Sequence, residues 1–131
     1  MRCGRSERRN EEGSAAAGFA LVAPLAVAVF LAVVQVVYLL VDCAVVQSAA
    51  HTAARVAATL GSTPQLGQTA ADSLLGQHGM TPARATYVWR NVVHSGVVFT
   101  EVHVSYPVSV NWLSTTVQVE GSAAVVDEDA L

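Results

Sequence analysis

The sequence predicts an α+β protein, in which a long N-terminal helix packs on a small domain with one short helix and an antiparallel β-sheet of about three to four strands. Two observations support this fold. The 131-residue chain is 53% hydrophobic and only 13% charged, whereas a typical soluble domain is about 25% charged, and the longest uncharged stretch lies near the N-terminus. The C-terminal third alternates β-branched and polar residues, which is typical of strands.

Residues 1–13 form a short hydrophilic leader, and no charged residue lies between Gly13 and Asp42. Lys and Arg near a membrane span favour its cytoplasmic side, while acidic residues count little. After the span, the next basic residue is Arg55. The leader arginines are Arg2, Arg5, Arg8 and Arg9. We therefore expect a cytoplasmic N-terminus and an extracytoplasmic C-terminus.

Residues 14–60 are predicted to form one helix with a transmembrane half and a projecting half. A span needs about 20 apolar residues to cross a hydrocarbon core about 30 Å thick, and residues 19–41 meet that need. A secretory signal peptide has a shorter apolar region of about 7–15 residues, and a core helix of this length would need a larger protein around it. Both alternatives are therefore less favoured.

The projecting half, residues 42–60, is rich in alanine and contains no glycine or proline. Alanines at 49/50, 53/54 and 57/58 keep small residues on one face, which allows close helix packing. We expect this face to pack on the C-terminal domain and, at other turns, on neighbouring helices. The predicted helix-packing residues are Ala50, Ala54, Arg55 and Ala58.

Residues 61–131 are predicted to form a small extracytoplasmic α+β domain. A hydroxyl cap and a proline at 62–64 begin a short helix, which Gly79 ends. Pro107 indicates that its strand lies at an edge or ends there. The expected strands are residues 86–93, residues 97–108, and one or two within residues 115–126.

Catalytic and ligand-binding motifs are absent from the sequence. The four histidines, His51, His78, His94 and His103, have no metal-ligand spacing. No serine lies in a nucleophile motif, and there is no glycine-rich phosphate loop. The net charge of −3 gives no overall reason to bind nucleic acid. We therefore expect no enzyme activity, metal, cofactor, small-molecule substrate or nucleic-acid partner.

Two cysteines are present, and the predicted membrane separates them. Cys3 lies in the leader, and Cys43 lies at the outer end of the span. Cys43 is therefore a candidate for an intermolecular disulfide outside the cytoplasm. The alternative, which we favour, is a small buried thiol between helices.

The junction after the leader carries a family resemblance. Gly13 is followed by S-A-A-A-G-F-A-L-V-A-P-L, which resembles the start of a type IV prepilin and, most closely, the TadE-like minor pseudopilins of the tight-adherence (Tad/Flp) pilus system. The resemblance implies cleavage by a prepilin peptidase between Gly13 and Ser14. Phe19 then becomes the sixth mature residue and Pro24 the eleventh, as in that family, whereas Gly18 stands where the family has a membrane-embedded Glu.

The resemblance also extends to the alanine-rich stretch 47–58 and implies a pilin-like fold. It implies a non-enzymatic, membrane-stored subunit that contributes to assembly of a Tad/Flp-type pilus or a related secretion apparatus. The implied partners are a prepilin peptidase, other pilins or pseudopilins, the Tad membrane platform and the lipid bilayer. The implied location is the bacterial cytoplasmic membrane, with access to a cell-surface pilus. The alternative is a single-pass anchor with a small extracytoplasmic protein-binding domain.

Overall fold

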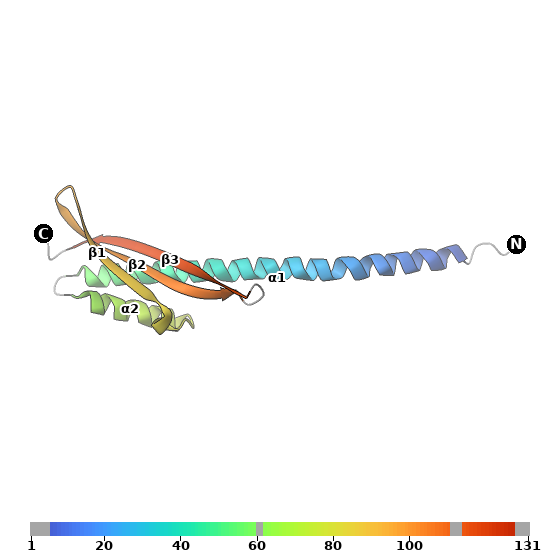
Figure 1. Cartoon of the computed structure of the whole chain (residues 1–131), viewed down its shortest axis with the longest axis horizontal. Helices are drawn as coiled ribbons and strands as arrows, with labels where there is room; N and C mark the ends of the chain where they lie inside the picture. Colours follow the sequence, from blue (N-terminus) through green and yellow to red (C-terminus); the bar gives the residue numbers. More distant parts are fainter. Residues whose placement is uncertain (1–5, 60–61, 111–113, 128–131) are drawn as a thin grey trace. The chain divides into compact units, whose positions relative to one another are not determined.

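The computed structural model describes residues 6–59, 62–110 and 114–127. The elements follow the order α1, α2, a short 3₁₀ helix η1, and strands β1, β2 and β3 (Figure 1). The chain divides into two compact units, Met1–Val37 and Tyr38–Leu131. The predicted α+β fold, with a long N-terminal helix, one short α-helix and an antiparallel sheet, is confirmed. The bounds are α1 Ser6–Ala57, α2 Pro64–Gln77, η1 Pro82–Arg84, β1 Thr86–His94, β2 Val97–Val110 and β3 Thr115–Val126.

Helix α1 begins at Ser6, inside the predicted leader, and runs through Gly13 and Ser14. Glu and Arg, which are good helix formers, fill much of the leader after Ser6, so the helix has no reason to start at the junction. Pro24 lies inside the helix. The helix ends at Ala57, while the predicted stop at Gly61 falls outside the described residues.

Helix α2 begins at Pro64, whose fixed φ suits a first helical position. An N–H at this position would have no acceptor within the helix, so the lack of one in proline costs nothing. Thr63 takes the N-cap position with an extended backbone, but its side chain forms no capping hydrogen bond. The predicted hydroxyl cap is therefore not formed. At the other end, Gly79 has a φ of +75°, and the N–H of Met80 donates to the carbonyl of Leu75 at 3.0 Å, which closes the helix.

The sheet has three antiparallel strands in the order β1-β2-β3. Strands β1 and β2 form a hairpin through Ser95 and Gly96, whose φ values of 54° and 83° suit a two-residue turn that matches strand twist. The region around Gly121 forms one continuous strand, β3, which pairs with β2 from Phe99↔Val126 to Val110↔Thr115.

Pro107 lies in the central strand, so the prediction of an edge strand is wrong for β2 as a whole. The physical reason is the unequal length of the strands. The pairing of β1 with β2 stops at Thr86↔Ser105, so Pro107 has a strand neighbour only on the β3 side, at Gln118. A residue without an N–H can occupy a locally one-sided stretch of this kind.

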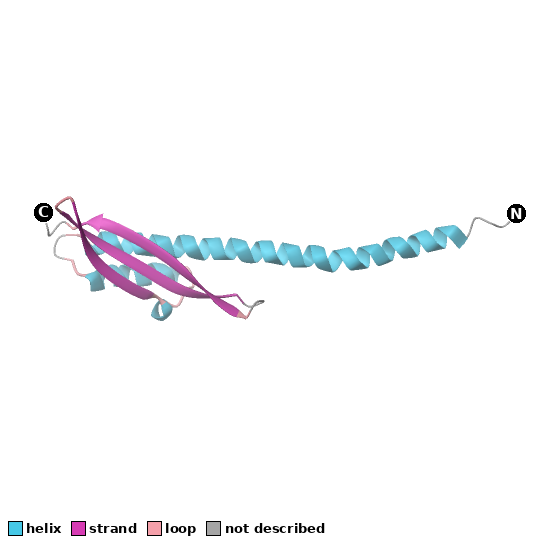
Figure 2. Ribbon diagram, turned by 45° about the horizontal axis from the view of Figure 1, so that its top comes forward, coloured by secondary structure: helices cyan, strands magenta, loops and turns pink. Residues whose placement is uncertain are grey.

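The core of the unit Tyr38–Leu131 lies between one face of the sheet and two helical segments, which are helix α2 and the C-terminal turns of α1 (Figure 2). The alternation expected of a strand is observed in β2, because Val102, Val104 and Tyr106 are buried while His103 is exposed. The fully buried residues with the largest side chains are Leu75, Val46, Val102 and Val104.

Candidate functional site

The first candidate surface is the apolar side of α1 in the unit Met1–Val37. From residue 16 onward, almost every side chain of this segment is exposed, and Phe19 and Leu21 reach 75% and 79%. A soluble protein rarely exposes so much contiguous apolar surface. Within the described residues, α1 is the one helix long and apolar enough to cross a membrane. A lipid bilayer would remove this surface from water without any protein partner.

The prepilin-like residues all lie on this helix. Gly13 and Ser14 have helical backbone, Phe19 is exposed, and Pro24 interrupts the hydrogen-bond ladder because it lacks an N–H. A Cβ added to Gly18 would meet nothing within 4 Å. Packing within the chain therefore does not require a glycine at that position, and a larger side chain would fit there.

The second candidate surface is the alanine face of α1 in the unit Tyr38–Leu131. Ala50 and Ala54 have no exposed surface, and Ala58 is 3% exposed, whereas Arg55 is exposed. Ala50 and Ala54 belong to the core cluster that also contains Val102 and Val104 of the sheet. The three predicted packing alanines are thus covered by the chain's own domain, and Arg55 is the one predicted packing residue that stays open to solvent.

Two glycines allow the backbones to approach this face closely. A Cβ on Gly67 of α2 would clash with the carbonyl oxygen of Ala53 and lie 3.1 Å from the Cβ of Ala57. A Cβ on Gly121 of β3 would lie 2.8 Å from the Cα of Gln47 and 2.8 Å from the carbonyl oxygen of Val46. Any side chain at either glycine would push α2 or β3 away from α1.

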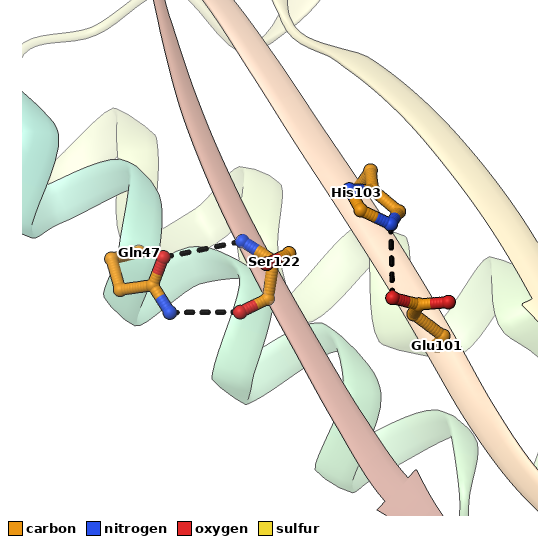
Figure 3. A network of polar contacts seen from close by, with 4 residues as sticks. All are labelled: Gln47, Glu101, His103 and Ser122. Carbon is orange, nitrogen blue, oxygen red and sulfur yellow. Dashed lines mark hydrogen bonds and ion pairs between the residues drawn. The ribbon is translucent and has the colours of Figure 1, made fainter.

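Gln47 joins α1 to β3 by two hydrogen bonds. Its Nε2 donates to the carbonyl oxygen of Ser122 at 2.8 Å, and the N–H of Ser122 donates to its Oε1 at 3.2 Å (Figure 3). The side-chain amide thereby pairs with β3 as a neighbouring strand would. On the neighbouring strand, Nε2 of His103 and Oε1 of Glu101 form a hydrogen bond at 3.0 Å.

Two tyrosines of the sheet form hydrogen bonds with α2 and with the segment that follows it. The hydroxyl of Tyr87 donates to Oδ1 of Asp72 at 2.6 Å, and the N–H of Thr81 donates to the hydroxyl oxygen of Tyr106 at 3.0 Å. Burial, together with the hydrogen bond and the negative charge of Asp72, raises the pKa of Tyr87 well above its ordinary value. Both tyrosines therefore act as structural hydrogen-bonding groups.

Cys43 is half-buried and packs against the core cluster, and its thiol is free within this single chain. Cys3 lies outside the described residues. In the described ranges, no group of three His, Cys, Asp or Glu side chains is placed to hold a metal ion. Over the same ranges, every buried side-chain polar atom has a hydrogen-bond partner.

The sequence reasoning did not single out Gln47, Gly67 or the Tyr87–Asp72 bond. A glycine inside a strand signals close backbone approach, so Gly121 could have indicated that β3 crosses a helix. Gln47 is a polar residue beside the alanine pairs, but its partner lies 75 residues away along the chain, and no local pattern can give that pairing.

Residues 13–55 match the family model described as TadE-like protein. The chain therefore carries a TadE-like segment. The predicted resemblance is confirmed over this range, which contains the junction, the apolar run and the first turns of the alanine face. No match was found among curated proteins or among solved structures. The TadE-like segment ends at Arg55, so α2 and the sheet lie outside it.

Proposed function

We propose that the chain is a TadE-like pseudopilin, a non-enzymatic subunit that is stored in the bacterial cytoplasmic membrane and contributes to assembly of a Tad/Flp-type pilus or a related secretion apparatus. The main support is the TadE-like match at residues 13–55, which coincides with a helix whose apolar side chains are exposed. The family match supports a Tad pilus-related role, and the exposed helix supports a membrane anchor.

The proposed arrangement has the leader in the cytoplasm, residues 19–41 of α1 in the bilayer, and residues 61–131 outside. The basic leader supports this orientation. The proposed partners are a prepilin peptidase acting between Gly13 and Ser14, other pilins or pseudopilins, and the Tad membrane platform. In the bilayer, contact with other subunits would use the exposed side chains of α1, since the alanine face is covered within the chain.

The decisive experiment is intact-mass analysis and N-terminal sequencing of the protein from its own cells. We expect a mature chain that starts at Ser14 in cells with the prepilin peptidase, and the full chain in cells that lack it. A Gly13→Leu variant should remain uncut, while a Gly18→Leu variant, which changes a position with open space around it, serves as the matched control and should still be cut. An intact Met1–Leu131 chain in peptidase-positive cells would contradict the proposal.

Gly18 favours one alternative, a single-pass anchor with a small extracytoplasmic protein-binding domain. A Glu at this position would pair with a neighbouring subunit's N-terminal amine inside the low-dielectric membrane, and glycine has no charge to offer. The anchor alternative expects an uncut leader and no co-purification with Tad components. Pull-down of the full chain from membranes, followed by detection of the Tad platform proteins, separates it from the pseudopilin proposal.

A further inference from the structure

The free edge of β1 is a row of backbone groups without partners. His94 and Val97 flank a two-residue turn, so they form a hydrogen-bonded pair, and pairing then alternates along the hairpin. The N–H and C=O groups of Val88, Arg90 and Val92 therefore face β2. Those of Tyr87, Trp89, Asn91 and Val93 face away from the sheet, and no described residue outside the sheet forms a backbone hydrogen bond with them.

The two edges of the sheet differ in how far other parts of the chain contact them. On β3, the amide of Gln47 occupies both backbone groups of Ser122, and α1 lies against Gly121. On β1, no residue is buried, every residue is paired with β2 without a bulge, and the strand contains no proline. The protection that β3 receives from α1 and from the Gln47 amide is thus absent at β1 in the described part of the chain, where the one charged side chain that can discourage pairing is Arg90.

The side chains of β1 define what could pair with it. Val88, Val92 and Val93 are 45%, 43% and 67% exposed, and β1 carries no acidic residue. Arg90 stands opposite Glu101 of β2, but the Glu101 carboxylate is hydrogen-bonded to His103, and Arg90 has no ion-pair partner among the described residues.

A second copy of this chain is a poor partner for β1. In an antiparallel pair of two β1 strands with full overlap, Arg90 of one copy would lie directly opposite Arg90 of the other. Like charges in directly opposed positions destabilise a strand pair. Charge complementarity instead favours a strand that brings a carboxylate to Arg90.

We propose that β1 accepts an extended segment of a partner protein as a fourth strand, and that this segment carries β-branched residues and an acidic residue facing Arg90. Backbone hydrogen bonds to Tyr87, Trp89, Asn91 and Val93 supply the pairing, while the exposed valines and Arg90 supply selectivity. This site lies outside the TadE-like segment and does not depend on whether the leader is cleaved.

The test uses the full chain in nanodiscs and two synthetic peptides of alternating Thr and Val, one with a central Glu and one with a central Lys. Hydrogen exchange is followed at single amides. We expect the Glu peptide at saturation to slow exchange at Trp89 and Asn91 about tenfold. Val88 and Arg90 should change little, because their N–H groups already donate to β2. The Lys peptide should bind about fivefold more weakly.

Two variants make the result specific to this edge. Asn91→Pro removes an outward-facing N–H and should abolish protection, whereas Gln118→Pro, the matched change at the outer edge of β3, should leave it intact. Arg90→Glu should reverse the preference between the two peptides. The proposal is overturned by unchanged exchange at Trp89 and Asn91, by equal affinity for both peptides, or by light scattering that shows a dimer that Asn91→Pro dissociates.

Discussion

The two parts of helix α1 share one secondary structure but differ in the size and the exposure of their apolar side chains. Residues 16–37 include many large apolar side chains that are exposed, such as Phe19, Leu25 and Phe30. In residues 45–58 the inward side chains are mostly alanine and have almost no exposed surface. Large apolar residues suit a fluid lipid environment that adapts to any shape, whereas small residues suit a rigid neighbour whose backbone must come close. Apolar residues therefore suit a lipid environment in one part of the helix and close packing within the protein in the other.

The largest expected effect comes from removing a buried side chain on one side of this comparison. Leu75→Ala should lower the free energy of unfolding of the C-terminal unit by about 3 kcal/mol, because Leu75 is fully buried and alanine would leave a cavity. Leu31→Ala, in the exposed part of α1, should change it by less than about 0.5 kcal/mol. Urea unfolding of the full chain in nanodiscs, followed by tryptophan fluorescence, measures both. Equal losses would show that the two regions do not differ as described.

The close approach of backbones gives a second contrast, with opposite signs inside one helix. Gly67→Ala should destabilise the C-terminal unit by about 2 kcal/mol, because the new methyl group would meet the carbonyl of Ala53. Gly76→Ala has open space around it and should stabilise by about 0.5 kcal/mol through helix propensity. The same unfolding measurement applies, and a stabilised Gly67→Ala protein would refute the tight contact.

A substitution of Gln47 tests how much the hydrogen bonds beside the alanine face contribute to stability. Gln47→Ala removes both hydrogen bonds to Ser122 and should cost about 1 kcal/mol. Gln68→Ala, at an exposed position of α2, should change stability by less than about 0.5 kcal/mol. Faster amide exchange at Ser122 in Gln47→Ala alone would confirm the cause, and unchanged exchange there would argue against it.

The smallest expected effect is a dependence of stability on alkaline pH. Tyr87 keeps its proton to higher pH in the folded state than in the unfolded chain, where its pKa is about 10.0. Its contribution is therefore fully present below that value and is lost as pH rises through the folded pKa. The stability difference between the parent and Tyr87→Phe should shrink above about pH 10. Urea titrations at pH 8 and at pH 11 measure it, and a constant difference would contradict the assignment.

Much of the fold could be predicted because its signals are local. The uncharged run from Ser14 and the alanine pairs indicate a long helix, and the alternation in β2 gives the correct buried face. The turn at Ser95 and Gly96 follows from residues that accept positive φ. The start of α1 differs from the prediction because the residues around the predicted junction contain no helix-breaking residue other than one glycine.

The remainder depends on contacts between distant residues. Pro107 was predicted to lie at a sheet edge or a strand end, but it lies in the central strand beyond the last residue paired with β1. The length of β1 relative to β2 cannot be predicted from either strand alone. The burial of Ala50 and Ala54, and the pairing of Gln47 with Ser122, arise only when the C-terminal part of the chain packs on α1. These features are set by the tertiary arrangement, which has no short sequence pattern.

The long separation between Gln47 and Ser122 also has a consequence for synthesis. The ribosome synthesises α1 before β3, so the alanine face stays exposed until the residues that bury it have been made. Alanine methyl groups expose far less apolar surface during that interval than leucine or valine would. The residues that permit tight packing at the end thus also keep the nascent helix a poor target for aggregation at the start.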